Sequence, residues 1–171
     1  IKEMMAHQAG LEAFIPFYKY TLTDGKPTAP WYQEKKDNVF SLEVAEALYL
    51  KGAYKDSMYA RIIRNPLKEK KYLYSDLCYY FMQPILEKIT GESQASYVRN
   101  HIYKLMGLRY INYKPLNFYN KSQIVPTEDD QYFRKQLLCG HVHDPGAAML
   151  GGVGGHAGLF SNATDLASIC L

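Results

Sequence analysis

The spacing of the apolar residues is the feature that most constrains this fold, because most of it follows the helical period. Residues 41–50 (SLEVAEALYL) and 55–64 (KDSMYARIIR) carry apolar side chains at helical spacing, and Pro66 closes the second segment. The clearest helix begins near Asp76, and Pro84 within it should kink or split it. The apolar stripe of this helix consists of Leu77, Tyr80, Phe81, Ile85 and Ile89.

Glycines and polar caps delimit the other expected helices. Residues 3–9 resemble the end of a helix stopped by Gly10, and Thr90-Gly91 stops the helix that starts near Asp76. Another helix opens with Ser93 as its N-cap and stops at Gly107, and a last one starts near Asn162. The residues expected to face inward from the Ser93 helix are Tyr97, Val98, Ile102 and Leu105.

Strands are expected to be few. Residues 108–140 are irregular in pattern, with one short strand around residues 133–138. We therefore predict a mainly α fold with few short strands, and no sheet complete enough to be stable alone.

Charge and hydropathy exclude two classes of protein. The net charge is only +3, and the basic residues are scattered among acids, so we expect no nucleic-acid partner. No apolar run approaches the roughly 18 residues that cross a bilayer, so we expect no membrane span in this segment. The three cysteines lack zinc-ligand spacing and do not indicate a disulfide framework.

The glycine cluster at residues 146–158 contains a pattern known from nucleotide-binding proteins. Residues 152–157 (GVGGHA) fit G-x-G-x-x-A, which binds a pyrophosphate only between a strand and the N-terminus of a helix. The preceding residues HDPGAAML indicate instead a turn and a short helix, and the next helix begins too late. We therefore expect no nucleotide cofactor.

A histidine cluster precedes these glycines. His141, His143 and Asp144 could bind zinc if the two imidazoles shared one face of a strand. The simpler interpretation is that His143 and Asp144 hold a loop by hydrogen bonds ahead of Pro145. We favour the loop, and expect neither a metal nor any other cofactor.

The triplet Tyr74-Ser75-Asp76 lies where the Asp76 helix begins. Its simplest interpretation is structural: Ser75 or Asp76 caps the helix, and Tyr74 packs beneath it. Taken alone, the triplet is weak support for a catalytic site.

Four segments together resemble the serine β-lactamase and penicillin-binding family, in particular its class C-like hydrolases and esterases. Residues 5–11 (MAHQAGL) resemble L-L-T-H-x-S-G-L, which follows the family's nucleophile helix, and residues 74–80 (YSDLCYY) resemble its second motif, Y-S-N-x-G-Y. Residues 93–108 are similar to the next helix, with its P-L-G-M ending. Residues 151–167 (GGVGGHAGLFSNATDLA) resemble the segment that borders the substrate cleft.

The resemblance implies acyl transfer, in which the serine of S-x-x-K attacks a carbonyl and the motif tyrosine moves its proton. It makes Tyr74 the general acid/base, and places Asp76 where the family usually has Asn, which puts classical β-lactam turnover in doubt. It also implies a substrate-binding role for His156, Gly158 and Ser161. Neither S-x-x-K nor K-T-G occurs in residues 1–171, and His156-Ala157-Gly158 spells H-x-G but matches the cleft border better.

The resemblance further implies that residues 1–171 are one partial domain, the helical lobe in the middle of an α/β domain, inactive without the remainder of the parent chain. Its substrate would be a β-lactam, a peptide-like amide or an ester, either a small molecule or derived from peptidoglycan. A periplasmic or cell-envelope location follows, and some related domains are fused to family 3 β-N-acetylglucosaminidases. The alternative is a non-catalytic module of the same fold that binds cell-wall fragments. An S-x-x-K upstream of Ile1 would favour the enzyme.

Overall fold

The computed structural model describes residues 1–171. The helices are α1 (Lys2–Met5), α2 (Tyr54–Arg64), α3 (Leu77–Tyr80), α4 (Met82–Thr90), α5 (Gln94–Val98), α6 (Pro145–Met149) and α7 (Ala163–Cys170). Three 3-10 turns (Phe17–Thr21, Pro115–Asn117, Lys121–Gln123) and a π-helical turn (Arg99–Tyr103) accompany them. The strands are β1 (Leu22–Thr23), β2 (Lys26–Pro27), β3 (Tyr32–Gln33), β4 (Leu42–Ala45), β5 (Leu48–Leu50), β6 (Asn112–Tyr113), β7 (Pro126–Asp130), β8 (Gln136–Cys139) and β9 (Leu159–Phe160).

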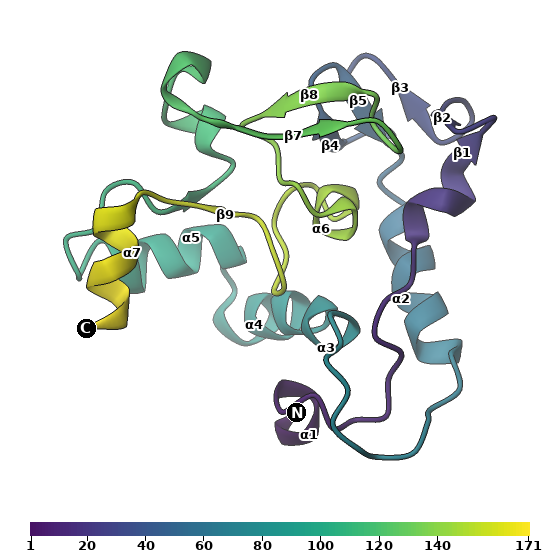
Figure 1. Ribbon diagram of the computed structural model, residues 1–171, viewed down its shortest axis with the longest axis horizontal. Helices are drawn as coiled ribbons and strands as arrows, with labels where there is room; N and C mark the ends of the chain where they lie inside the picture. The colour runs from purple at the N-terminus through teal and green to yellow at the C-terminus, as the bar shows by residue number, and fades with distance from the viewer.

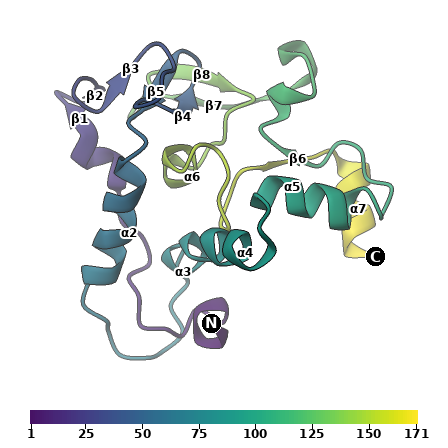
Figure 2. The ribbon, with the colours of Figure 1, turned by 180° about the vertical axis from the view of Figure 1, so that it is seen from behind.

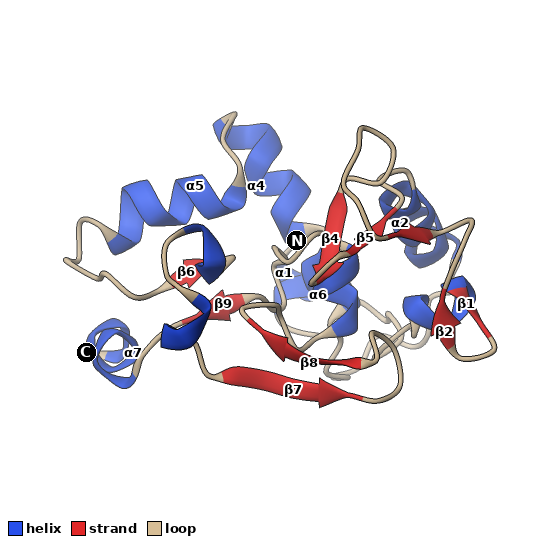
Figure 3. Ribbon diagram, turned by 90° about the horizontal axis from the view of Figure 1, so that it is seen from above, coloured by secondary structure: helices blue, strands red, loops and turns tan.

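The strands form four small antiparallel sheets rather than one large one. They pair as β1–β2, β3–β5–β4, β6–β9 and β7–β8. Figures 1 and 2 place α6 between the β4, β5, β7 and β8 strands and the helices α3 and α4. Seen from above, α4 and α5 lie on one side of α6 and the β7–β8 hairpin on the other (Figure 3). The short helix α6 is therefore the centre around which the other elements pack.

Small residues on α6 allow this close packing. Ala147 and Met149 are completely buried, and they belong to a core of 15 buried residues that includes side chains from α2, α3, β4 and β5. A Cβ atom at Gly146 would lie 1.6 Å from the hydroxyl oxygen of Tyr80, so only glycine fits beneath that ring. The sequence PGAAM thus brings the backbone of α6 directly against α3.

Most of the expected helices are confirmed. The helix at 55–64 is α2, and the one near Asp76 is split at Phe81 into α3 and α4. Pro84 lies in the first turn of α4, where backbone N–H groups have no partner within the helix, so its missing donor is tolerated. The Ser93 side chain accepts a hydrogen bond from Ser96 N–H, and Asn162 accepts one from Asp165 N–H, so both caps are as expected.

The prediction of a mainly α fold is wrong. The chain is 36% helical and 15% strand, and residues 41–50 form the β4–β5 hairpin instead of a helix. Leu42 and Val44 also fit a period of two, and Ala47 adopts a positive φ of 49° in the tight turn. A short apolar run fits both periods, and here pairing with β3 and packing on α6 decide for the strand.

Two inward-facing stripes were also predicted too long. Ile89, at the end of α4, is 78% exposed, and Leu105 is 80% exposed. Ile102 is exposed as well, because the helix after Val98 continues as a π-helical turn, which rotates the following side chains off the α-helical stripe.

Candidate active site

The Tyr74-Ser75-Asp76 turn is anchored to the N-terminal segment. Ser75 N–H donates to His7 Nδ1 at 3.1 Å, and Ser75 Oγ donates to the carbonyl of Glu12 at 2.5 Å. The backbone N–H of Asp76 donates to the carbonyl of Ala13 at 3.2 Å. Neither Ser75 nor Asp76 makes a side-chain capping bond to α3, so the capping interpretation is wrong. The buried serine ties two distant segments together instead.

Tyr74 projects from this anchored turn toward solvent. Its side chain is 62% exposed, and its ring packs against the imidazole of His7 with 4.5 Å between centroids. It does not pack beneath α3, the structural role considered for it from the sequence. An exposed hydroxyl on a backbone fixed at the next two residues is a suitable arrangement for a group that must meet a substrate.

Asp76 lies on the inner side of the same turn, at the N-terminus of α3. Burial raises the pKa of its carboxyl, His156 and His7 oppose that rise, and the carboxylate of Asp144 adds to it. The pKa of Asp76 thus depends on the N-terminal segment, through His7, and on the glycine segment, through His156.

The glycine segment packs against the other face of α3. The ring of Tyr80 stacks on the imidazole of His156, with 4.3 Å between centroids and 9° between planes. His156 Nε2 lies 2.9 Å from Asp144 Oδ1, and the same oxygen accepts a hydrogen bond from Ala147 N–H at the start of α6. A Cβ atom at Gly155 would lie 2.4 Å from the carbonyl oxygen of Tyr79, so the two backbones approach closely.

The electrostatics of this buried pair are consistent with an ionised carboxylate. Burial raises the pKa of Asp144, but the hydrogen bonds from His156 and from Ala147 N–H outweigh it, and the net pKa is lowered. His156 is 2% exposed at its side chain, and its Nδ1 is buried without a hydrogen-bond partner. The imidazole therefore faces the interior, packed beneath α3.

The predicted substrate-binding residues lie along two adjoining hollows. His156 and Gly158 line a cleft of about 490 Å³, together with Phe160 and Asp144. Ser161 lines a neighbouring hollow of about 530 Å³, which also includes Phe160. Tyr74 and Asp76 line neither hollow, although the Asp76 carboxyl is close enough to His156 and Asp144 for them to affect its pKa. Gly158 has a φ of 120°, and a Cβ atom there would lie 2.6 Å from the carbonyl oxygen of Gly152.

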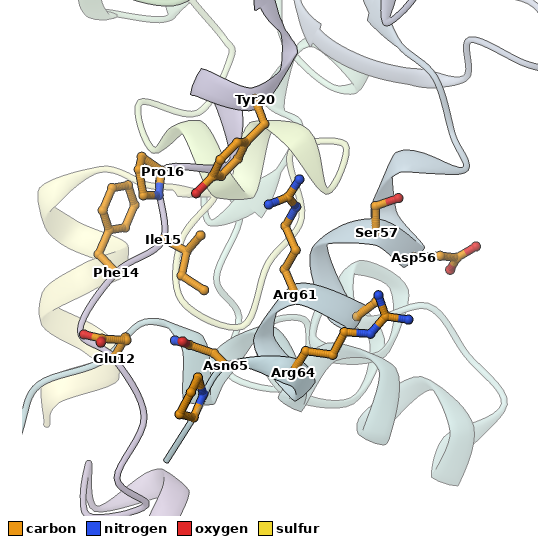
Figure 4. Close-up of a pocket in the computed structure, with 12 residues that line it drawn as sticks. Glu12, Phe14, Ile15, Pro16, Tyr20, Asp56, Ser57, Arg61, Arg64 and Asn65 are labelled. Atoms are coloured by element: carbon orange, nitrogen blue, oxygen red, sulfur yellow. The ribbon is translucent and has the colours of Figure 1, made fainter. Parts of the chain in front are cut away.

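The largest hollow lies elsewhere. It has a volume of about 990 Å³ and is formed by α2 and by residues 12–20, with Glu12, Tyr20 and Arg61 among its lining side chains (Figure 4). None of the predicted site residues lines it. Glu12 connects this hollow to the Tyr74 turn: it lines the hollow, and its backbone carbonyl accepts the hydrogen bond from Ser75 Oγ.

The zinc and nucleotide alternatives have a poor geometric basis. His141 faces Glu43 and His143 faces Glu128, each at 3.5 Å, so the two imidazoles approach different carboxylates. Residues 1–171 contain no group of three or more His, Cys, Asp or Glu residues placed to hold a metal ion. The glycines of residues 152–157 follow α6 and precede β9, the reverse of the strand-to-helix order that binds a pyrophosphate.

Two residues of the site were missed as such from the sequence. Tyr80 was assigned only to an apolar stripe, and Asp144 only to the histidine cluster. The pattern Asp144-Pro145 does carry a signal, because an acidic N-cap followed by proline at the first helical position is a common start of a helix. No local signal predicts that Tyr80 stacks on His156, since the two are joined only by the fold.

No helix in residues 1–171 combines the length and apolar character needed to cross a membrane.

Comparison with known proteins identifies the family of the chain. The chain is 35% identical over 158 residues to a protein of Escherichia coli (strain K12) named putative D-alanyl-D-alanine carboxypeptidase, an alignment covering 84% of this chain and 34% of that protein. It is 31% identical over 177 residues to the N-acetylmuramyl-L-alanine amidase of Bacillus subtilis (strain 168), covering 96% of this chain and 35% of the relative. The chain thus spans about a third of the length of these relatives. The sequence model of the Beta-lactamase family matches residues 1–171, and the chain belongs to that family.

Proposed function

We propose that this chain is an internal part of a serine hydrolase that cleaves peptide-like amides of the cell wall, with Tyr74 as its general acid/base. The observation that carries the proposal is the Tyr74 turn: an exposed phenol on a backbone anchored by buried Ser75. Membership of the Beta-lactamase family and the cell-wall relatives support the reaction class. A periplasmic or cell-envelope location is part of the same proposal.

The proposed reaction is acyl transfer. A serine of the parent protein, in an S-x-x-K motif, adds to the substrate carbonyl and gives its proton to Tyr74, which returns it to the leaving amine. A tyrosine hydroxyl titrates near pH 10, so a base at neutral pH needs a shift of about 3 units, or about 4 kcal/mol. Nearby ammonium groups supply such a shift in principle, and the lysine of S-x-x-K is the proposed source.

Asp76 argues for an amide substrate over a β-lactam. The family usually has Asn here, whereas this chain has a half-buried carboxyl whose pKa is raised mainly by burial. A carboxylate attracts a cationic group and cannot donate the hydrogen bonds that an amide nitrogen donates. We propose that this exchange lowers turnover of β-lactams while leaving peptide-like amides as substrates.

The test uses the parent protein and a peptide ending in D-alanyl-D-alanine. We expect release of D-alanine, and Tyr74→Phe should lower kcat by about 10²–10⁴-fold with little change in melting temperature. Tyr132→Phe is the matched control, because Tyr132 is also exposed, at 40%, and lines neither of the hollows that contain the predicted substrate-binding residues. Equal turnover by Tyr74→Phe and wild type would reject the role of Tyr74. Saturable binding of the peptide without turnover would favour the non-catalytic module.

A second test concerns residues 1–171 alone. Because no S-x-x-K occurs in this sequence, the isolated chain should hydrolyse neither a chromogenic cephalosporin nor an aryl ester above background. Mass spectrometry should detect no covalent label after incubation with a fluorescent penicillin. A burst of acylation at any serine of this chain would mean that the nucleophile lies within it.

A further inference from the structure

We infer that His7 is a positioning residue for Tyr74, and that it does so only as a neutral imidazole with its proton on Nε2. This inference rests on the proposed role of Tyr74 and adds the residue that holds it. We assign His7 no contact with the substrate, because it acts through the Tyr74 turn.

The hydrogen bonds of His7 define its protonation state. The Ser75 N–H can only donate, so Nδ1 of His7 must present a lone pair to accept this hydrogen bond at 3.1 Å. The backbone carbonyl of His7 also accepts a hydrogen bond from Leu73 N–H at 2.9 Å. His7 therefore holds the residues on both sides of Tyr74, one through its backbone and one through its ring.

The ring of His7 also sets the direction of the Tyr74 side chain. Its centroid is 4.5 Å from that of Tyr74, 5.3 Å from that of Tyr79 and 6.1 Å from that of Tyr72. Tyr79 is itself fixed, because its hydroxyl donates to the carbonyl of Met5 at 2.9 Å. The ring of His7 thus contacts both Tyr79, whose hydroxyl is hydrogen-bonded, and Tyr74, which is exposed.

Protonation of His7 would oppose this arrangement. A proton on Nδ1 would face the Ser75 N–H, so the hydrogen bond would be replaced by a repulsion between two donors. The titratable groups beside the ring are the hydroxyls of Tyr72, Tyr74 and Tyr79 and the carboxyl of Asp76. The Glu3–Lys70 ion pair joins the same two segments of the chain.

The backbone of His7 offers a matched pair of variants. Its φ is 55°, in the left-handed region that Asn tolerates better than most residues. In His7→Asn the side-chain oxygen can take the place of Nδ1, and it cannot be protonated. In His7→Gln the amide group lies at the position of Nε2 instead, so the acceptor for Ser75 N–H is lost while size and polarity are kept.

The experiment measures kcat/KM against pH for the parent protein, with the D-alanyl-D-alanine peptide as substrate. A misplacement of about 1 Å can lower a rate about 10²-fold, so we expect His7→Gln to lose about 10-fold or more in kcat with little change in KM. His7→Asn should stay within a few-fold of wild type and should lose less activity than wild type on the acid side. Full activity of His7→Gln, or an unchanged acid limb in His7→Asn, would overturn the inference.

Two further measurements separate this inference from the proposed function. If Tyr74→Phe is inactive and His7→Gln is fully active, only the role of His7 fails; if Tyr74→Phe is fully active, the proposed function itself fails. Imidazole ¹⁵N chemical shifts of the parent protein report the tautomer without any activity. They should show an unprotonated Nδ1 at neutral pH, and a Ser75 amide shift that changes as His7 titrates. A protonated Nδ1 at neutral pH would reject the inference even if every variant failed to fold.

Discussion

The β7–β8 hairpin and the N-terminal segment hold their charges in opposite ways. In the hairpin, the side chains of Arg134 and Asp130 are fully buried and lie 2.6 Å apart. On the N-terminal side, the Lys68–Glu12 and Lys70–Glu3 pairs are half exposed. The comparison indicates that residues 142–143, just before α6, are held by buried charge, whereas the Tyr74 turn is held mainly by neutral hydrogen bonds of Ser75 and His7.

Arg134 provides the strongest test of this contrast. Its guanidinium donates to Asp130, to the Val142 carbonyl and to the His143 carbonyl, at 2.6–2.7 Å. Arg134→Met would leave Asp130 buried without its cation, and we expect a loss of about 3–5 kcal/mol in the free energy of unfolding. Urea unfolding of the parent protein measures it. Arg134→Met combined with Asp130→Asn should recover part of the loss, and a loss below about 1 kcal/mol for the single variant would contradict the contrast.

Gly146 tests the contact between α6 and α3. Gly146→Ala would place a Cβ atom 1.6 Å from the Tyr80 hydroxyl oxygen, so the ring must move off His156. Overpacking of this kind typically costs about 1–3 kcal/mol. Tyr80→Phe should partly rescue Gly146→Ala, because the hydroxyl that collides is buried without a hydrogen-bond partner. Strictly additive effects in urea unfolding would show that the two residues are not coupled.

The lowered pKa values of Asp144 and Asp130 predict how the stability of the fold depends on pH. Burial raises both pKa values, but the hydrogen bonds that each carboxylate accepts lower them further, so both end below their ordinary value. A carboxyl with a lowered folded pKa stabilises the fold above its unfolded pKa, near 4, and loses that contribution as the pH falls through the folded pKa. We therefore expect the contribution of these two carboxyls to the free energy of unfolding to be constant from neutral pH down to about pH 5 and to be lost below about pH 4.

Asp144→Asn isolates one of these contributions. Both hydrogen bonds end on the same oxygen, Oδ1, so Asn can keep them and lose only the charge. We expect a loss of about 1 kcal/mol at pH 7, the difference between charged and neutral hydrogen bonds. The loss should shrink toward pH 3 in urea unfolding. An equal loss at both pH values would mean that the charge of Asp144 does not stabilise the fold.

Local signals predicted much of the helical structure. Ser93, Gly91 and Asn162 delimit helices through their own hydrogen bonds or positive φ, so neighbouring residues are enough to identify them. The β4–β5 hairpin was missed because its ten residues fit a helix equally well. The strand β7 (PTEDD) has a composition disfavoured in strands, and it exists because β8 pairs with it and Arg134 binds Asp130.

The candidate site likewise contains residues that a local motif predicts and contacts that only the fold creates. Tyr74 and Asp76 could be identified because a motif in one short segment carries the resemblance. The bonds from Ser75 to His7 and to Glu12 join residues 68 and 63 positions apart, and no period or spacing predicts such pairs. His156 was expected to line the substrate cleft, and its position is more buried than that role suggests, because Asp144 and Tyr80 hold its ring inward.

The smallest expected effect belongs to the exposed ion pair between Lys68 and Glu12. Their charged atoms are 2.8 Å apart, with side chains 53% and 37% exposed, so a double-mutant cycle should give a coupling of about 0–1 kcal/mol, reduced further by salt. The backbone at the same place should matter more. Gly10 has a φ of 73°, its carbonyl accepts from Lys68 N–H at 2.7 Å, and a Cβ atom there would lie 2.5 Å from the Lys68 carbonyl oxygen. Gly10→Ala should therefore destabilise the parent protein more than Lys68→Ala. The opposite order would mean that charge, and not backbone contact, joins the N-terminal segment to the Tyr74 turn.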